Sequence, residues 1–352
     1  MVTKKSITIG GTVVKPGQRT NISLPVADLY TSTSLSMPLQ VISGRRDGPV
    51  LFVSAAIHGD ELNGVEAIRR LLRLKALRSI RGTLIAVPIV NVHGFLNQSR
   101  YLPDRRDLNR SFPGSAKGSI AARLANTFYT EVVSKADYGI DMHTGAINRS
   151  NLPQIRANLD DKKTLELANC FGVPVIINAN IRDNSLRASV SELGVPVLIY
   201  EAGEALRFDE MSIRAGLRGI LNVMRLIGML PAKRAAKRAV KPVLARSMSW
   251  VRAPSSGIFN TDVSLGSSVS KGQRLATISD PLGDSSEILV APFDGIIIGR
   301  NNLPLAHEGD ALFNVAVFKN VSRAEDLVEE FTTKLDNQNN AGLVTSPTEL
   351  KK

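Results

Sequence analysis

The chain has 352 residues, of which 43% are hydrophobic, and it carries a formal net charge of +12. This length is sufficient for two globular domains, and no apolar stretch reaches the roughly 20 residues of a membrane-spanning helix. A single cysteine, Cys170, excludes an intramolecular disulfide, and the N-terminus lacks the apolar segment of a secretory signal. We therefore expect a protein of the reducing cytoplasm.

The positive charge is partly concentrated in residues 231–246, which contain six basic residues and no acidic one. This composition predicts a solvated basic linker. Binding of nucleic acid would usually add aromatic residues for base stacking or a recognisable motif, and aromatic residues make up 5% of the chain. We therefore predict no nucleic-acid partner and no membrane partner.

The predicted elements begin with short strands and turns in residues 1–45. Further along the chain, continuous apolar runs alternate with segments whose apolar residues recur at helical spacing. The runs predict strands at 49–57, 82–90, 138–144, 173–179 and 195–204. The helical patterns predict helices at 61–77, 119–136, 161–172, 185–194 and 209–228.

Continuous runs of valine, isoleucine and leucine predict strands that are buried on both faces. Such strands require helices on both sides of a largely parallel sheet, so residues 1–230 are predicted to form a doubly wound α/β domain. In folds of this class the chemistry gathers at the carboxyl ends of the strands. His58, Asn91, His143 and Glu201 all follow or end a predicted strand, which indicates a site at that edge.

The composition changes after the basic segment. Residues 247–320 contain short predicted strands separated by glycine, aspartate, serine and proline, with a weak internal repeat. This pattern predicts a small all-β barrel-sandwich domain built from two similar halves. Residues 321–352 are predicted to form a helix and, from about Asp336, a polar disordered tail.

Two of the four histidines indicate a metal site. Hydrolytic zinc sites use three protein ligands from histidine, aspartate and glutamate, and they leave a fourth position open. His58 and His143 end strands of one predicted sheet, and Glu61 follows His58 by one helical turn. Taken singly, Asp60 and Glu61 fit an ordinary capped helix start, and His143 fits a buried core histidine. The joint placement of the three residues favours a shared metal ion.

Four short motifs occur in order along the chain, namely HGDE at 58–61, DLNRSFPG at 107–114, DMHTG at 141–145 and YEAGE at 200–204. Through these motifs the chain resembles the succinylglutamate desuccinylase/aspartoacylase family, within the wider zinc-carboxypeptidase group, over about residues 45–228. The resemblance implies a zinc-carboxypeptidase-like α/β fold, in which a doubly wound, largely parallel mixed sheet has helices on both faces.

The resemblance also implies one Zn²⁺ per chain, bound by His58, Glu61 and His143. Glu201 matches the family's catalytic glutamate, which takes a proton from water and then delivers it to the leaving amine. Asp141 is expected to orient His143, with a simple turn role as the alternative.

A substrate clamp is implied as well. Asn109 and Arg110 match the pair that binds the substrate's carboxylate, which suits the forked geometry of a guanidinium group. Bracing of a long loop is the alternative for this pair. The family places a further arginine before the motif, near the scissile carbonyl. Arg100 is assigned to that role here, while Arg105 and Arg106 remain candidates.

Residues 247–320 resemble biotinyl/lipoyl barrel-sandwich domains through the segment GSSVSKGQRLATI at 266–278. Carrier domains of that kind present a modified lysine on a hairpin between the two halves. The corresponding segment here, 280–289, contains no lysine, and Lys271 belongs to the turn motif instead. We therefore predict an unmodified structural or oligomerisation module.

Together these features predict a zinc-dependent hydrolase that cleaves an amide bond next to a carboxylate. Deacylation of a small N-acyl amino acid ranks first, and a metallocarboxypeptidase that trims Glu/Asp-rich peptide tails ranks second. A catalytically inactive basic interaction module is the third alternative, and the intact motif residues count against it. The partner is thus expected to be a small carboxylate-bearing substrate or an acidic peptide tail, and a homo-oligomer is left open.

Overall fold

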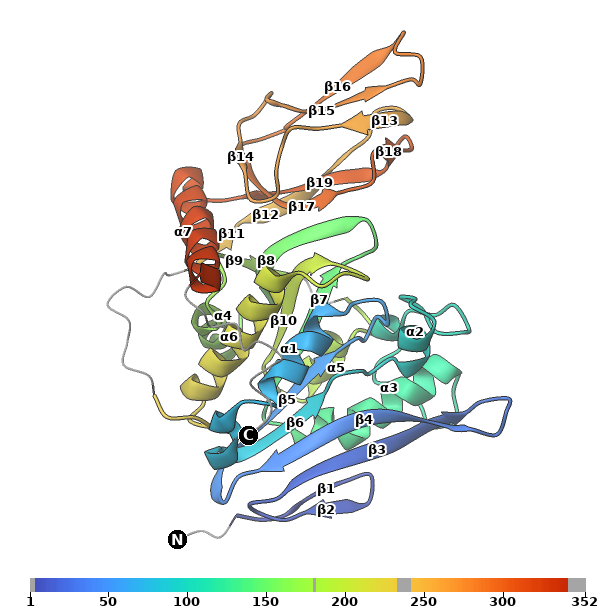
Figure 1. Ribbon diagram of the computed structural model, residues 1–352, viewed down its shortest axis with the longest axis vertical. Coiled ribbons are helices and arrows are strands. Elements are labelled where there is room, and N and C mark those ends of the chain that lie inside the picture. Colours follow the sequence, from blue (N-terminus) through green and yellow to red (C-terminus); the bar gives the residue numbers. More distant parts are fainter. Residues whose placement is uncertain (1–3, 180–181, 233–241, 341–352) are drawn as a thin grey trace.

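The structure is a computed structural model that describes residues 4–179, 182–232 and 242–340. Figure 1 shows a large sheet with helices on both of its faces and a smaller sheet at one end of the molecule. This arrangement confirms the predicted α/β class with a mixed sheet between two layers of helices. Among the described residues, no helix is long and apolar enough to cross a membrane.

The described residues form three sheets, of thirteen, four and two strands. The large sheet contains β3 (Arg19–Asp28), β4 (Ser34–Ser43), β5 (Arg46–Ala55), β6 (Arg81–Val87), β7 (Tyr138–Gly145), β8 (Arg149–Ala157), β9 (Val175–Asn178), β10 (Val197–Glu204), β11 (Val243–Ala245), β12 (Ser247–Arg252), β14 (Ser268–Val269), β17 (Gly295–Asn301) and β19 (Ala311–Val317). The four-stranded sheet contains β13 (Gly257–Asn260), β15 (Arg274–Ser279), β16 (Ser286–Val290) and β18 (Leu305–Ala306), and the two-stranded one β1 (Ile7–Ile9) and β2 (Thr12–Val14).

Seven α-helices and three short 3₁₀ helices complete the described chain. The α-helices are α1 (Asn63–Leu71), α2 (Val92–Leu96), α3 (Ile120–Glu131), α4 (Lys162–Phe171), α5 (Leu186–Glu192), α6 (Glu210–Leu226) and α7 (Val321–Asn340). The 3₁₀ helices are η1 (Lys75–Ser79), η2 (Leu108–Arg110) and η3 (Val133–Lys135).

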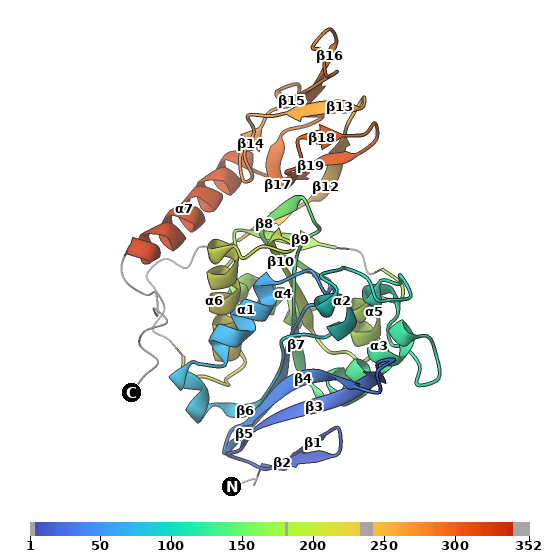
Figure 2. The ribbon, with the colours of Figure 1, turned by 45° about the vertical axis from the view of Figure 1, so that its right-hand side comes forward.

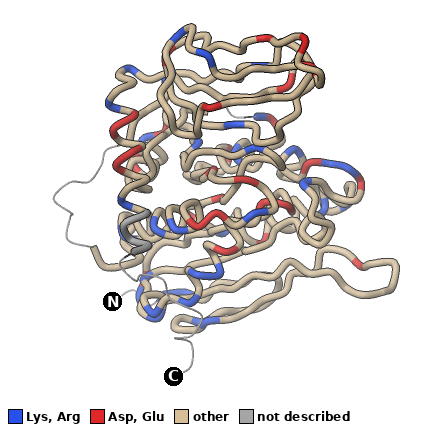
Figure 3. The backbone as a smooth tube through the Cα atoms, turned by 45° about the horizontal axis from the view of Figure 1, so that its top comes forward, with Lys and Arg blue, Asp and Glu red and all other residues tan. Residues whose placement is uncertain are grey.

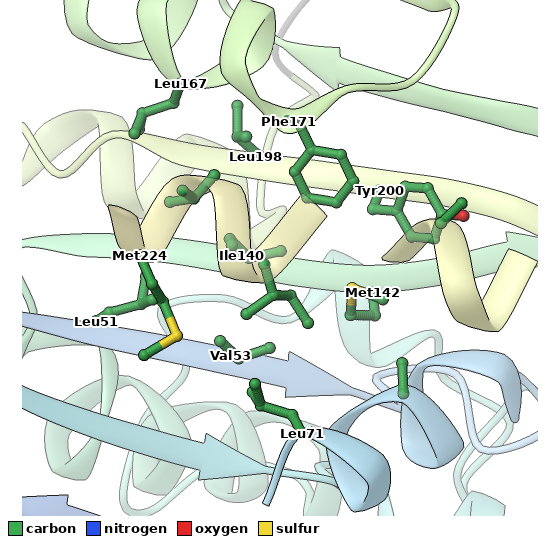
Figure 4. Close-up of a cluster of buried hydrophobic side chains, with 14 of the residues drawn as sticks. Leu51, Val53, Leu71, Ile140, Met142, Leu167, Phe171, Leu198, Tyr200 and Met224 are labelled. Carbon is green, nitrogen blue, oxygen red and sulfur yellow. The ribbon is translucent and has the colours of Figure 1, made fainter. Parts of the chain in front are cut away.

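The two layers of helices cover opposite faces of the sheet. Leu71 of α1, Phe171 of α4 and Met224 of α6 pack in one buried cluster against the strands, as Figure 4 shows. Phe128 of α3 and Leu186 of α5 belong to a second cluster on the other face. Because successive strand residues point to opposite faces, β5, β6 and β10 contribute side chains to both clusters. Strands buried on both faces in this way read as continuous apolar runs.

The centre of the large sheet is parallel, and this brings the predicted site residues together. β5 pairs in parallel with β6 and β7, and β7 pairs in parallel with β10. In the β7–β10 ladder, His143 lies opposite Glu201. His58 follows the end of β5, the strand on the other side of β7, so all three residues meet at one edge of the sheet.

A glycine allows α1 to approach this edge closely. A Cβ atom on Gly64 would lie 2.4 Å from Cβ of Met142 on β7 and 2.8 Å from Cβ of Ala55 on β5. The first turn of α1 therefore lies directly against both strands. Glu61, just before the helix, is held at the strand ends as a result.

Strand β8 was not expected from the sequence. It runs antiparallel between β10 and β17, whereas the sequence analysis assigned no element to residues 149–157. The segment contains a proline and several polar residues, so it lacks the apolar run that marks its parallel neighbours. Two side chains of β8 approach Glu201, namely those of Asn151 and Arg156.

Four other elements differ in extent from the prediction. β3 and β4 each contain ten residues and pair into the large sheet, so the N-terminal strands are longer than expected. The helix predicted at 61–77 is shorter, because Leu74 is extended and separates α1 from η1. Within the predicted tail, α7 continues to Asn340. The remainder, 341–352, lies outside the described residues.

Residues 243–340 form what we call the C-terminal module, which lies at one end of the molecule in Figure 2. Its four-stranded sheet packs on β12, β17 and β19 around a separate apolar core. Five strands of the module (β11, β12, β14, β17 and β19) belong to the large sheet, and they join the rest of it where β17 pairs with β8 and β11 with β9. β11 falls at the end of the predicted linker, whose residues 233–241 lie outside the described chain. The likeness to biotinyl/lipoyl domains and the domain boundaries stay predictions.

Candidate metal centre and neighbouring glutamate

The HGDE motif forms a tight turn between β5 and α1. The backbone N–H of Glu61 donates to the carbonyl of His58 over 3.1 Å. Gly59 fits closely here, because a Cβ atom at this position would lie 2.0 Å from the carbonyl carbon of Gly94. The N-cap of α1 is Leu62, with no side-chain hydrogen bond, so Asp60 does not cap the helix. The start of α1 is therefore not capped by Asp60, which the alternative interpretation of this motif required.

Glu61 lies between the two histidines. Its Oε1 is 2.7 Å from Nδ1 of His58, and its Oε2 is 2.8 Å from Nδ1 of His143. One donor atom from each of the three residues lies within 4.8 Å of the other two. All three side chains are buried, with residue exposures of 1–4%. The donor set matches the two imidazoles and one carboxylate of a hydrolytic zinc site, so the residues present fit a metal ion.

A carboxylate contacts the Nε2 atom of each histidine, on the side of the ring opposite Glu61. Nε2 of His58 lies 3.2 Å from Oδ1 of Asp107, and Nε2 of His143 lies 2.7 Å from Oδ2 of Asp141. The hydroxyl of Ser54 donates to the other oxygen of Asp141 over 2.8 Å. Carboxylates in this position fix the ring orientation of metal-binding histidines and keep Nδ1 available. Asp107 was missed as a partner of His58, although it opens the DLNR run that the sequence singled out.

The charges of the cluster depend on one another. Burial would raise the pKa of Glu61, but the imidazoles of His58 and His143 outweigh burial and hold that pKa far below its usual range. Burial would lower the pKa of His58, but Glu61 and Asp107 raise it above the ordinary 6.5. Asp141 and Glu61 likewise overcome burial and raise the pKa of His143 well above that value. A divalent cation among these donors would replace the protons on the imidazoles.

Glu201 lies on β10 next to His143 and is held from β8. Nδ2 of Asn151 donates to its Oε2 over 2.8 Å, while Nε of Arg156 lies 3.8 Å from its Oε1. The Glu201 side chain is 19% exposed, so its carboxylate is partly accessible from solvent. Sequence reasoning missed Asn151 and Arg156 because it missed the strand that carries them.

Among the three candidate arginines, Arg100 reaches the cluster. Its Nη1 donates to Oε1 of Glu61 over 3.3 Å, and its Nη2 donates to Oδ2 of Asp107 over 3.1 Å. Arg105 and Arg106 are exposed. The Arg100 guanidinium therefore lies directly beside the donor set.

Asn109 and Arg110 occupy the loop that faces α5. Oδ1 of Asn109 accepts a hydrogen bond from the backbone N–H of Leu186 over 3.0 Å, and this contact braces the loop. The exposed Arg110 donates to the carbonyl of Asn109. Asn109 thus does brace the loop, as the alternative interpretation of this pair expected, but it uses only its Oδ1 atom for this contact. The remaining N–H groups are the donors that a carboxylate would need.

Several arginines gather near Glu201. Burial, followed by the nearby charges of Arg156 and, to a smaller extent, Arg110, lowers the pKa of Arg187 on α5 to about 10. Glu201 opposes this effect. Guanidinium groups that repel one another around a half-open site favour an anionic substrate. Figure 3 shows that lysine and arginine also occur on many other segments of the backbone.

The other two histidines and Glu204 have no contact with the cluster among the hydrogen bonds of the described residues. His93 is on α2 and buried, and burial lowers the pKa of its imidazole. His307 is in the C-terminal module, in the turn after β18. Glu204 accepts the backbone N–H of Asn148 over 3.0 Å and Nδ2 of Asn302 over 2.9 Å, which links it to that module.

The fold and the site define an α/β protein with a buried His-Glu-His group at the carboxyl ends of parallel strands. A family model described as the succinylglutamate desuccinylase/aspartoacylase catalytic domain matches residues 47–227, just over half of the chain. The chain therefore belongs to this family, which confirms the resemblance seen in the four motifs. Its homologues include deacylating hydrolases that act on amide bonds.

Individual relatives agree with this assignment. The N-alpha-acetyl-L-2,4-diaminobutyric acid deacetylase of Halomonas elongata is 26% identical over 310 residues, which cover 84% of this chain and 90% of the relative. The product-bound ectoine utilization protein EutE of Ruegeria pomeroyi is 27% identical, with a TM-score of 0.76 and coverage of 85% and 95%. A succinylglutamate desuccinylase/aspartoacylase from Rhodobacter sphaeroides is 25% identical, with a TM-score of 0.76 and coverage of 85% and 96%.

Proposed function

We propose that the protein is a zinc-dependent hydrolase that removes the acyl group from an N-acyl amino acid. The observation that carries this proposal is the buried donor set of His58, Glu61 and His143 with Glu201 on the adjacent strand. A zinc ion at this position would polarise the amide carbonyl and lower the pKa of water. The family assignment and the deacetylase from Halomonas elongata support the deacylation of an amino acid.

The chain's own residues would move the proton and hold the substrate. Glu201 accepts a proton from the attacking water and delivers it to the departing amine nitrogen. Arg100 faces the carbonyl oxygen as negative charge grows on it. Asn109 and Arg110 bind the substrate's carboxylate, so that the scissile amide lies beside the metal.

The second candidate function is the trimming of acidic peptide tails. The arginines near Glu201 favour it, because several positive groups could bind successive carboxylates. In either case we propose that the partner is a carboxylate-bearing molecule. A small N-acyl substrate ranks first, because the curated relative is named as a deacetylase of an acetylated amino acid.

Product analysis of the zinc-loaded protein tests the proposal. The substrates are N-acetyl and N-succinyl amino acids, including N-alpha-acetyl-2,4-diaminobutyrate, and short peptides that end in several glutamates. Release of a free amino acid from an N-acyl substrate, abolished in His58→Ala, is the expected result. Release of C-terminal glutamate alone would favour the second function. No turnover of either set by protein with one zinc per chain would contradict both.

A further inference from the structure

Asn151 lies at the junction between the proposed catalytic strand and the C-terminal module. It stands opposite Gly203 of β10 on one side and opposite Gly299 of β17 on the other. We propose that Asn151 is a positioning residue for Glu201 and that β17 of the C-terminal module holds Asn151 in place. The inference rests on the proposed function, in which Glu201 moves the proton.

The contact with Glu201 is direct. The Asn151 amide donates to Oε2 over 2.8 Å, and Asn151 is only 7% exposed. Arg156 lies 3.8 Å from Oε1, which is too far for a direct hydrogen bond. With Oε2 held by a neutral donor, the carboxylate keeps one orientation and Oε1 stays available for a proton. A general base acts well only when it is placed accurately toward the proton that it takes.

The other side of Asn151 is packed against β17. A Cβ atom on Gly299 would lie 3.1 Å from Oδ1 of Asn151, 3.2 Å from Cβ of Asn314 and 3.5 Å from Cη2 of Trp250. A Cβ atom at position 299 would therefore fit tightly, and Asn151 or Asn314 would have to shift by a few tenths of an ångström to admit it. One of the two groups that it crowds is the amide that holds Glu201.

Contacts of the two residues that precede Asn151 help to fix this register. Nδ2 of Asn302 donates to Oγ of Ser150 over 2.6 Å and to Oε2 of Glu204 over 2.9 Å. The guanidinium of Arg149 lies over the ring of Trp250, 5.4 Å from its centroid. The first residues of β8 are therefore fastened to the C-terminal module. The role we infer for the module is thus to set the geometry of Glu201.

Two substitutions of Asn151 test the first half of the inference. Asn151→Leu keeps the approximate size and removes the donor, and Asn151→Asp keeps the shape but places a second acceptor against the carboxylate. We expect kcat to fall about 10- to 100-fold, as for loss of a hydrogen bond to a charged group. KM should change by less than about threefold, because Asn151 is only 7% exposed and its amide is engaged by Glu201. Zinc content should stay at one per chain.

A double-mutant cycle separates positioning from a general structural role. If Asn151 acts through Glu201, adding Asn151→Leu to Glu201→Gln should change the residual kcat by less than about twofold. A merely structural role would lower kcat in both backgrounds and overturn the inference. Wild-type kcat in Asn151→Leu with an impaired Glu201→Gln would also overturn it, while leaving the proposed function intact. Wild-type kcat in Glu201→Gln would instead overturn the proposed role of that glutamate.

Changes inside the C-terminal module test the second half. Gly299→Ala leaves Asn151 unaltered but crowds its amide, so kcat should fall with KM nearly unchanged. Asn302→Ala, which loosens the same junction, should give a smaller decrease and serves if Gly299→Ala does not fold. The matched control is Ser268→Ala, which removes a hydrogen bond to Glu325 elsewhere in the module and should keep wild-type kcat. Wild-type kcat in folded Gly299→Ala and Asn302→Ala would overturn the part assigned to β17.

Discussion

Oδ2 of Asp141 lies 2.7 Å from Nε2 of His143, on the side of the imidazole that faces away from Glu61. Asp141 is fully buried, and Ser54 occupies its other oxygen. The ring of His143 is therefore held from both ends, with Nδ1 turned toward the donor set. A histidine prepared in this way binds a metal with little reorganisation.

Asp141→Asn should weaken zinc binding by about 10- to 100-fold, because the amide can no longer support the imidazole as an anion does. Competition with a chromophoric chelator measures the affinity. Asp161→Asn is the control, since Asp161 caps α4 away from the cluster and should leave zinc affinity unchanged. Equal zinc affinity in Asp141→Asn and the wild type would mean that this carboxylate serves the fold alone.

Removal of the histidines should remove the metal. The double substitution His58→Ala and His143→Ala leaves Glu61 as a lone carboxylate, which is too weak a site to retain zinc through purification. We expect about one zinc per chain in the wild type and none in the variant, by elemental analysis. Chelator-treated wild type should lose activity and regain it on addition of zinc. Zinc-replete wild type without bound metal would contradict the site.

Glu201→Gln should keep zinc and lose turnover. Glutamine has the shape of glutamate but cannot accept and deliver a proton, and general acid-base catalysis typically contributes about 10²- to 10⁴-fold. Steady-state kinetics with elemental analysis of the same sample checks both points. Near-normal kcat would reassign the proton transfer to another group, whereas loss of zinc would make Glu201 a ligand.

The parallel half of the site could be predicted from the sequence because it depends on local patterns. His58, His143 and Glu201 each follow or end a predicted strand, and parallel strands bring their carboxyl ends to one edge. The antiparallel partner β8 could not be predicted, because its proline and polar residues do not form such a run. Its place is set by β10 and β17, which are distant in sequence. The positions of Asn151 and Arg156 beside Glu201 could therefore not be predicted from the sequence.

The metal-free protein should respond to pH through its three clustered groups. The pKa values of His58 and His143 are raised from 6.5, so their stabilising contribution is complete below 6.5 and is lost as pH rises through the raised values. The pKa of Glu61 is lowered from 4.5, so its contribution is present above 4.5 and is lost in strong acid. The cluster therefore stabilises the metal-free protein most between pH 4.5 and pH 6.5.

Thermal unfolding of metal-free protein should accordingly give a lower Tm at about pH 8.5 than at about pH 6. Zinc replaces the protons on the imidazoles, so zinc-loaded protein should lose less Tm over this range. For the same reason zinc affinity should rise with pH above 6.5. The double variant His58→Ala, His143→Ala lacks the imidazoles and should show a smaller decrease in Tm. Equal changes in Tm between about pH 6 and about pH 8.5 in the metal-free wild type and this variant would contradict the coupling.

The dependence of kcat/KM on salt should separate the two candidate substrate classes. A chain with a net charge of +12 and several arginines near Glu201 attracts a polyanionic peptide over a distance, which mainly raises the association rate. Salt shortens that range to about 8 Å near 0.15 M, so kcat/KM for a glutamate-rich peptide should fall steeply as salt rises. An N-acyl amino acid with one carboxylate should show a shallow slope.

The contribution of the arginines near Glu201 can be isolated from that of the basic residues of 231–246. Five of the six basic residues of 231–246 lie at 233–241, and replacing those five with glutamine lowers the net charge without touching Glu201. If the site arginines attract the substrate, this variant should keep most of the salt dependence, whereas Arg156→Gln should lose part of it. Good turnover of N-acyl amino acids together with a flat salt response for acidic peptides would eliminate tail trimming and leave deacylation as the function.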